Sequence, residues 1–373
     1  MNSKVIHIVS LDVPFPPDYG GMIDVFYRIK ALHKLGFSIH LHCFTYGRGK
    51  PVELKNYCSE IHFYERKKRM SDFFSSRPFV VQTRRSDDLL KRLLADDHPV
   101  LLEGLHCCWY LEHPEIRKKT TIVRTHNIEH DYYQELMKSA AGFKKLFFRS
   151  EYKKLKRYES ILSQADYLLA IKEGDRAYFE ILNSNTYVLP ASLPKMEQQE
   201  ITEPKGYCLF HGNLSVEENN ASARWLLEHV IPKLNGIPVV IAGKNPGWEL
   251  VEAAKKWRVN IVVNPSEAHM NQLIAEARIH VLPSTQATGL KLKLLAALQT
   301  VGTVIVNSNM IQGNDLGQYC IVVDSAEEFV AAIQREFHKP IDLADRKRQI
   351  EAFLAQHDTT DAIVRVFREI HLM

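Results

Sequence analysis

Two lysines stand where a predicted strand gives way to a helix. The segment Pro283-Ser-Thr-Gln-Ala-Thr-Gly-Leu-Lys-Leu-Lys-Leu-Leu-Ala-Ala-Leu298 ends a strand at Pro283, continues through a polar loop and begins a helix near Gly289. Lys291 and Lys293 then fall in the first turn, where positive charge opposes the helix dipole, and no acidic residue in that turn compensates. A phosphate bound to the free backbone N–H groups would reverse this effect. The pattern therefore indicates an anion site, with two solvated lysines as the alternative.

A histidine follows a predicted strand in the first half of the chain. Val123-Arg-Thr-His-Asn-Ile-Glu-His130 places His126 at the carboxyl end of that strand, where α/β folds bind ligands. A satisfied structural histidine is the alternative. Residues 126–130 also fit His-x-x-Glu-His, the zinc motif of inverted metalloproteases. That chemistry needs both histidines on one helical face and a third ligand, whereas the residues before His126 are typical of a strand.

Basic residues concentrate between positions 138 and 157. Eight Lys or Arg side chains occur there against one carboxylate, Glu151, and Leu146, Phe147 and Phe148 interleave with them. Such a helix can bind an anionic membrane surface or a polyprenyl-phosphate-linked acceptor. The alternative is a solvated helix whose apolar stripe packs on the first domain. The basic side chains are those of Lys138, Lys144, Lys145, Arg149, Lys153, Lys154, Lys156 and Arg157.

The composition is that of an ordinary globular protein. The chain has 373 residues, of which 45% are apolar and 25% charged, and this length favours two domains. A net charge of +4 is too small to indicate a nucleic-acid partner. No apolar run approaches the roughly 20 residues that span a bilayer, and the first ten residues lack the features of a secretory signal. Six cysteines without Cys-x-x-Cys spacing indicate reduced thiols, so we expect a cytoplasmic protein, with the inner membrane face as an extension of the basic stretch.

Apolar, β-branched runs alternate with helical patterns in both halves, which indicates parallel βαβ units. The pattern breaks at Pro190, and a polar, proline-bearing stretch follows. We expect two Rossmann-like domains with doubly wound parallel sheets facing a shared cleft. The predicted parts are an acceptor-side domain at 1–190, a linker at 191–204, a nucleotide-sugar-binding domain at 205–345 and a helical segment at 346–373 that packs back on the first domain.

These patterns predict short strands with helices between them, including a helix near the start of the chain and a helical stretch at its end. The first helix is expected from about Met22 to Leu35, and the last stretch, Leu343 to Leu372, as helical. The strands are expected at Val5–Val9, Ser38–Phe44, Ile61–Tyr64, Val100–Leu102, Thr121–Arg124, Tyr167–Ile171, Tyr207–His211, Val239–Ala242, Asn260–Val263, His280–Pro283, Thr303–Asn307 and Ile321–Val323.

The segment with the two lysines resembles a signature of the group 1 (family 4) glycosyltransferases. Gly289-Leu-Lys-Leu-Lys-Leu-Leu295 is similar to Gly-x-Lys-x-Lys-x-Leu-Glu-Ala of one branch of that family. His211-Gly-Asn-Leu-Ser-Val-Glu-Glu-Asn-Asn220 is similar to the opening of that branch's second domain, and Val240-Ile-Ala-Gly243 to its next strand and glycine turn. Together these motifs cover most of residues 207–306.

Two further motifs of the first half are similar to the same family. Pro14-Phe-Pro-Pro-Asp-Tyr-Gly-Gly21 resembles its proline-rich loop ending in Gly-Gly, which implies that the backbone of Gly20 and Gly21 approaches the donor diphosphate; a tight turn is the alternative. The His-Asn-x-Glu segment implies that His126 contacts the transferred sugar as the catalytic residue. The resemblance implies donor binding by Gly20, Gly21, Gly212, Asn213, Gly243, Thr288, Gly289, Leu290, Lys291 and Lys293.

The resemblance implies the GT-B fold and transfer of a sugar from a nucleoside-diphosphate sugar to a glycan or polyprenyl-linked acceptor, in polysaccharide biosynthesis. It implies retention of the anomeric configuration, with neither metal nor cofactor. Among the positions that depart from the family, Asp24 stands where an Arg is frequent, and Ala296 where a Glu holds the ribose. The alternatives are a degenerate, non-catalytic GT-B protein that acts as a binding partner, which Ala296 would explain, and a nucleotide-sugar epimerase of the same architecture.

Overall fold

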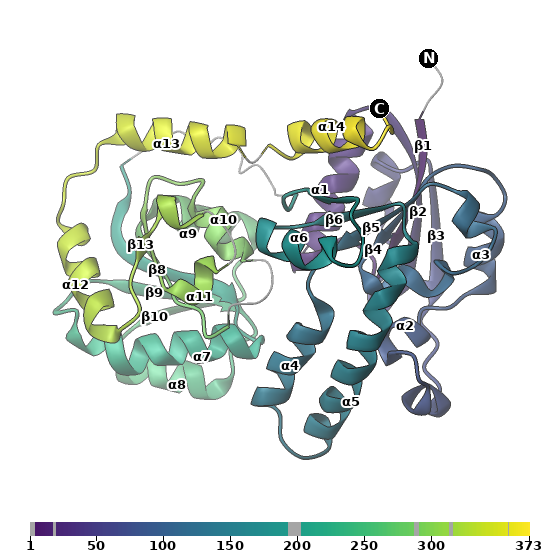
Figure 1. The fold of residues 1–373 in the computed structure, drawn as a ribbon. Helices are drawn as coiled ribbons and strands as arrows, with labels where there is room; N and C mark the ends of the chain where they lie inside the picture. Colours follow the sequence, from purple (N-terminus) through teal and green to yellow (C-terminus); the bar gives the residue numbers. More distant parts are fainter. Residues whose placement is uncertain (1–3, 18–19, 193–202, 287–290, 313–315, 357) are drawn as a thin grey trace. The chain divides into compact units, whose positions relative to one another are not determined.

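The alternating pattern folds into two parallel sheets with helices packed on them (Figure 1). A computed structural model describes residues 4–17, 20–192, 203–286, 291–312, 316–356 and 358–373. The chain forms two units, one of Met1–Pro194 with Asp358–Met373 and one of Lys195–His357. Each unit has the Rossmann-like arrangement that was expected, so the predicted fold class is confirmed.

Unit 1 is built on a seven-stranded sheet in which every pair of neighbours is parallel. The strand order is β3-β2-β1-β4-β5-β6-β7. Its strands are β1 (Lys4–Ser10), β2 (Phe37–Thr45), β3 (Glu60–Glu65), β4 (Val100–Glu103), β5 (Thr121–Thr125), β6 (Tyr167–Ala170) and β7 (Thr186–Val188). Its helices of α type are α1 (Gly20–Lys34), α2 (Phe79–Gln82), α3 (Asp87–Leu93), α4 (Glu129–Ser139), α5 (Gly142–Tyr158), α6 (Glu173–Glu180) and α14 (Thr359–Glu369).

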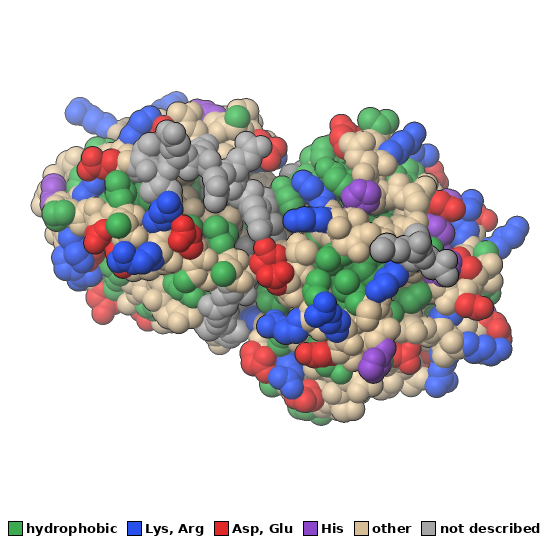
Figure 2. All heavy atoms as spheres, turned by 90° about the horizontal axis from the view of Figure 1, so that it is seen from above, with side chains coloured by type: hydrophobic (Ala, Val, Ile, Leu, Met, Phe, Trp, Pro, Cys, Tyr) green, Lys and Arg blue, Asp and Glu red, His purple; other side chains and the backbone are tan. Residues whose placement is uncertain are grey.

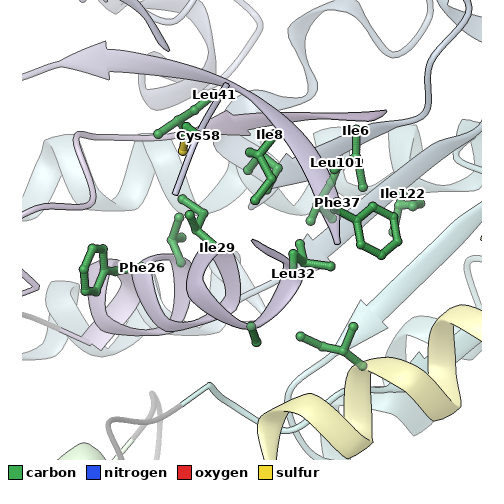
Figure 3. Close-up of a cluster of buried hydrophobic side chains, with 14 of the residues drawn as sticks. Ile6, Ile8, Phe26, Ile29, Leu32, Phe37, Leu41, Cys58, Leu101 and Ile122 are labelled. Carbon is green, nitrogen blue, oxygen red and sulfur yellow. The ribbon is translucent and has the colours of Figure 1, made fainter. Parts of the chain in front are cut away.

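The central strands of unit 1 are buried on both faces because helices cover both. Ile6 and Ile8 of β1 face the core beneath α1, whereas Val9 belongs to the core on the opposite face. On α1, Phe26, Ile29 and Leu32 recur at helical spacing and pack on the first of these cores (Figure 3). This packing sets the position of α1 relative to the carboxyl ends of the strands.

The last helix of the chain belongs to unit 1. Asp358 caps α14, since its carboxylate accepts from the backbone N–H groups of Thr360 and Asp361. Phe367 is fully buried and meets the ring of Phe37 edge-on at 5.8 Å between centroids. Helix α14 lies beside α1 in Figure 1, and both contribute to the same core.

Unit 2 has a six-stranded parallel sheet in the order β10-β9-β8-β11-β12-β13. Its strands are β8 (Lys205–Asn213), β9 (Val239–Lys244), β10 (Asn260–Val263), β11 (Ala277–Leu282), β12 (Thr303–Val306) and β13 (Ile321–Val322). Its helices of α type are α7 (Glu217–Trp225), α8 (Trp248–Lys256), α9 (Glu267–Glu276), α10 (Leu292–Ala297), α11 (Ser308–Ile311), α12 (Ala326–Phe337) and α13 (Leu343–Gln356).

Four details differ from the predicted elements. Strand β7 was not predicted, and β11 covers 277–282 where a strand at 280–283 was expected. The stretch expected to be one helix from Leu343 forms α13 and α14, with Asp358 as the cap that begins the second. Helix α1 begins at Gly20, ahead of the predicted start. Residues 193–202 of the predicted linker lie outside the described residues.

Acidic and basic side chains are interspersed on the face shown in Figure 2, in keeping with a net charge of +4. None of the helices among the described residues is both long and apolar enough to cross a membrane.

Candidate functional site

In unit 2, the lysines predicted to bind an anion lie at the start of α10. The helix covers only Leu292–Ala297 and is held by the buried side chains of Leu294 and Leu295. Lys291 is its N-cap residue, with φ −91° and ψ 67°, and Lys293 is its second residue. The prediction that both lysines lie in the first helical turn is therefore wrong for Lys291, and the helix begins later than Gly289.

Lys291 is paired with a carboxylate from another helix. Its Nζ lies 2.5 Å from Oε1 of Glu218 on α7 and 3.1 Å from Oγ of Ser284, which follows β11. Lys291 is only 8% exposed. As the sequence indicated, the first turn of α10 holds no acidic residue, and the compensating carboxylate comes from α7.

Lys293 has a neutral partner. Its Nζ donates to Oδ1 of Asn219 at 2.8 Å and lies 5.0 Å from the ring centroid of Phe210. Burial lowers the pKa of Lys293 to about 8, with Glu218 opposing the shift and Lys291 adding to it. Two ammonium groups thus share one carboxylate in this cluster of described residues, so an anion would improve the local charge balance.

The predicted glycines of unit 2 connect to this cluster. Asn219 also donates from Nδ2 to the carbonyl of Asn213, and a Cβ at Gly212 would meet the Asn219 side chain at 3.2 Å. Gly243 pairs with Gly212 across β8 and β9, where a Cβ would lie 2.0 Å from the Gly212 carbonyl oxygen. Gly212 and Asn213 therefore lie beside Lys293, whereas Gly243 serves the close approach of two strands.

Thr288, Gly289 and Leu290 were also predicted to bind the donor, but they lie outside the described residues. In unit 1, Gly20 and Gly21 form the first two positions of α1. The two glycines are therefore helical where a loop conformation was expected.

A set of fully buried charges lies at the carboxyl edge of the unit 1 sheet. Arg28 of α1 donates from Nη2 to both oxygens of Glu103 at 2.8 and 2.6 Å, and from Nη1 to Asp24 at 3.0 Å. Arg124 of β5 donates from Nε to the same Asp24 oxygen at 3.1 Å. Burial alone would raise the pKa of Asp24, but Arg124 and Arg28 hold it well below its usual range. Two arginines and two carboxylates therefore balance in the interior.

His126 lies against these carboxylates. Its Nε2 is 3.0 Å from Glu103 Oε2 and its Nδ1 is 3.8 Å from Asp24 Oδ2, and the residue is 9% exposed. Although burial favours the neutral carboxyl, Arg28 and His126 lower the pKa of Glu103. Nε2 therefore carries a proton and donates a hydrogen bond to Glu103, whereas Nδ1 makes the weaker contact with Asp24. Asp24 links His126 to the helix that Gly20 and Gly21 begin.

The geometry of residues 126–130 does not fit a zinc protease. His126 precedes α4, whereas Glu129 and His130 are its first residues, so the two histidines do not share a helical face. His130 Nδ1 lies 2.8 Å from Glu159, a different carboxylate from the one that His126 contacts. Burial, with Glu159 adding to it, raises the pKa of Glu129 to about 8. Glu129 is therefore a protonated carboxyl at neutral pH.

Several residues of these clusters were missed from the sequence. Glu218 and Ser284 approach Lys291 from distant segments of the chain, and no local sequence pattern indicates such contacts. Arg28 offered a signal, because an arginine with Asp24 four residues earlier falls on the apolar face of a predicted helix.

The cluster of unit 2 lies in a stretch of sequence that matches a known family. Residues 205–338 match the sequence profile of the family described as "Glycosyl transferases group 1". A 44.6 kDa protein in the cps region of Klebsiella pneumoniae is 26% identical over 329 residues, which cover 82% of this chain and 83% of that protein.

Comparison with solved structures shows the same fold over nearly the whole chain. WaaG, a glycosyltransferase involved in lipopolysaccharide biosynthesis, has a TM-score of 0.64 at 12% identity and covers 97% of this chain and 98% of its own. The S. aureus TarM G117R mutant, in complex with fondaparinux, alpha-GlcNAc-glycerol and UDP, has a TM-score of 0.66 at 10% identity and covers 99% of each chain. These likenesses extend over both parallel-sheet units.

Proposed function

We propose that this chain, whose residues 205–338 match the group 1 glycosyltransferases and whose two units share the fold of WaaG and TarM, moves a sugar from a nucleoside-diphosphate sugar to a glycan or polyprenyl-linked acceptor in polysaccharide biosynthesis. The observation that carries the proposal is the cluster of Lys291, Lys293 and Glu218, in which two ammonium groups share one carboxylate. A donor diphosphate would add negative charge beside both ammonium groups. UDP, which is bound in the TarM structure, is the first nucleotide to test.

The two lysines have different parts in this proposal. Glu218 and Ser284 fix the ammonium of Lys291, so its charge is oriented before the donor arrives. Among the described residues, Lys293 is held by an amide oxygen and an aromatic face, neither of which carries a full negative charge, so its ammonium gains most from a phosphate. Positive groups fixed in advance stabilise the charge that develops on a leaving diphosphate, and losing one such donor costs about 10²–10³ in rate.

The proposed donor site includes the turn that follows β8. Gly212 and Asn213 lie beside Asn219, which holds Lys293, so their backbone is available at the same place. Thr288, Gly289 and Leu290 immediately precede Lys291 and complete the proposed set. The reaction needs no metal in this scheme, since the lysines take the place that a divalent cation has in other transferases.

In unit 1 we propose that His126 contacts the transferred sugar, with Gly20 and Gly21 near the diphosphate. The proposal for His126 is supported by its position directly after β5 and by its contact with an ionised carboxylate. Glu103 fixes the ring through Nε2, which directs Nδ1 away from that bond as the acceptor for a sugar hydroxyl. Retention of the anomeric configuration is part of the same proposal.

We also propose that the helical hairpin α4–α5 contacts an anionic lipid surface. Helix α5 buries Leu155 against unit 1 but leaves Phe143 81% and Leu146 63% exposed among its basic residues. Apolar side chains that are ringed by lysines bind membranes through partial insertion and charge attraction. The inner stripe also agrees with the expectation that this helix packs on the first domain.

Lipid binding is tested by sedimentation with vesicles that contain or lack anionic lipid. The account predicts binding to anionic vesicles only, and a clear loss for Phe143→Ser. Ile181→Ser removes another exposed apolar side chain of unit 1, 83% exposed, and should bind like the wild type. Equal binding by all three proteins would remove this part of the proposal.

Transfer itself is tested by incubating the full chain with radiolabelled UDP-sugars and lipid-linked glycans extracted from membranes. We expect label in the lipid fraction in the presence of EDTA, and an anomeric configuration in the product, measured by NMR, equal to that of the donor. Substitution of Lys293 by Met should reduce the initial rate by about 10²–10³. Undiminished transfer by that variant would contradict the assigned donor site.

A further inference from the structure

Histidines gather on one face of the unit 1 sheet, on the side opposite α1. His7 of β1 pairs with His40 of β2, and His42 of β2 pairs with His62 of β3, so the four rings lie on the same face. Asp96 lies in the connection between α3 and β4. This connection ends beside His7, because Val100, the first residue of β4, pairs with His7. This is the edge at which the strands start, whereas His126 follows the end of β5.

We propose that His7, His40 and Asp96 form a binding site for a divalent transition-metal ion, with zinc as the best match. One ligand atom from each residue, two imidazole nitrogens and a carboxylate oxygen, lies within 4.8 Å of the other two. Imidazole and carboxylate are the zinc ligands that a site without thiolates uses. The site is separate from the glycosyl-transfer proposal and does not depend on it.

The distances are close to those that a tetrahedral ion requires. Ligands at about 2.0–2.1 Å from a tetrahedral zinc lie roughly 3.3 Å from one another. His7 Nε2 and Asp96 Oδ2 are 3.0 Å apart, so these two atoms need to separate only slightly. His40 must move farther, and its ring contacts the half-exposed Glu60 at 3.9 Å and meets the rings of His7 and His98 edge-on.

One oxygen of the Asp96 carboxylate, Oδ2, can bind the ion. Oδ1 accepts from Lys119 Nζ at 3.2 Å and from the backbone N–H of His98 at 3.0 Å. His7 Nε2, the nitrogen that would bind the ion, lies 3.0 Å from Oδ2 and 3.1 Å from Oδ1. A metal placed between Nε2 and Oδ2 replaces this shared contact and leaves the bonds from Lys119 and His98 to Oδ1 in place. Lys119 supplies an opposing charge, which the ion must overcome.

The hydrogen bonds behind His7 can adjust to a metal. His7 Nδ1 lies 2.9 Å from His42 Nε2, and His42 Nδ1 lies 2.8 Å from the Tyr64 hydroxyl. With the His7 proton on Nε2, the chain runs from Tyr64 to His42 to His7. When a metal takes Nε2, the proton moves to Nδ1 and the chain reverses, with His7 donating to His42 and His42 donating to Tyr64.

This reversal only moves protons along the hydrogen-bonded chain, so no proton is gained or lost. A metal-bound histidine that donates its second N–H to a fixed acceptor is the arrangement that orients such ligands. His42 is thus a positioning residue behind the proposed ligand His7.

The test is zinc binding to the full chain by isothermal titration calorimetry after EDTA treatment and buffer exchange. We expect one zinc ion per chain, and affinity at least about tenfold weaker for His40→Ala. His40→Cys restores a zinc ligand at the same place and should bind within about tenfold of the wild type. His62→Ala is the matched control, because His62 is equally half-buried on the same face but lies outside the three ligands.

The thermal unfolding of each apo variant establishes that it is folded before titration. Three results would overturn the proposal: no saturable binding by the wild type, unchanged affinity in His40→Ala, or an equal loss in His62→Ala. The last result would mean adventitious binding by exposed histidines only. None of these readouts depends on glycosyl transfer, so the proposed function and the zinc site stand or fall separately.

Discussion

The ammonium of Lys293 is the group through which pH should control donor binding. Burial lowers its pKa to about 8, with Glu218 raising it and Lys291 lowering it. A diphosphate beside it favours the charged form, so the pKa rises again in the complex. At pH values well below 8, Lys293 is already charged in the free protein, so it does not make the affinity depend on pH in that range. Above pH 8 binding takes up a proton, so affinity falls as the pH rises.

The size of the effect follows from the same pKa. At pH 9 about one Lys293 in ten is still protonated, so the Kd for a nucleoside diphosphate should be about tenfold higher at pH 9 than at pH 7. The phosphates themselves titrate near pH 6 and remain ionised across this range. Isothermal titration calorimetry with UDP at pH 7, 8 and 9 measures the change directly. Buffers of different ionisation enthalpy would show the proton uptake at pH 9.

Two variants separate Lys293 from every other group. Lys293→Arg keeps a charge that does not titrate in this range, so its affinity should stay constant from pH 7 to 9. Lys293→Met should bind weakly at every pH and also without the slope. A wild-type Kd that does not change between pH 7 and 9, or a slope that persists in Lys293→Arg, would refute the reasoning.

Three further predictions concern stability. The pKa of Glu129, about 8, lies above its usual value, so the stability that its neutral carboxyl contributes is complete at low pH and is lost as the pH rises toward 8. Between pH 5 and 8.5, the free energy of unfolding of the wild type should therefore fall by on the order of a few kcal/mol more than that of Glu129→Gln, as measured by denaturant unfolding. Phe367→Ala should lower the free energy of unfolding of unit 1 by about 3–5 kcal/mol, measured by urea denaturation, and an unchanged midpoint would contradict the docking of α14. Arg28→Met should cost about 3–5 kcal/mol by the same assay because Asp24 and Glu103 lose a buried partner, and a cost below about 1 kcal/mol would show that the cluster is not an interdependent unit.

The fold was predictable where local pattern decides the structure. Parallel strands that are buried on both faces give largely apolar runs, and these placed β1 and β2 correctly although His7, His40 and His42 interrupt them. Strand β7 is three residues long, with a partly exposed Tyr187 at its centre, so it has no such run. The break before α14 had a local signal, since Asp358 followed by two threonines is typical of a helix cap.

The site was predictable only in part, because its contacts join distant segments. The sequence indicated Lys291 and Lys293, but the partner of Lys291 is Glu218, which lies on another helix. The arrangement around His126 likewise depends on Glu103, which ends the neighbouring strand β4, and on Asp24, which the packing of α1 on the sheet brings to it. Pairings of this kind follow from tertiary structure, and single-sequence periodicity carries no information on them.

The central claim is that the lysines of α10 bind the donor diphosphate, and thermal unfolding with UDP, GDP and ADP tests it most directly. At a ligand concentration of 100 times the Kd, binding stabilises the folded protein by about 2.7 kcal/mol, which raises the unfolding temperature by several degrees. The account predicts such a shift with one nucleotide, its loss in Lys291→Ala, and its persistence in Lys255→Ala, which removes an exposed lysine of the same unit. A shift of equal size in Lys291→Ala, or no shift with any nucleotide, would contradict it.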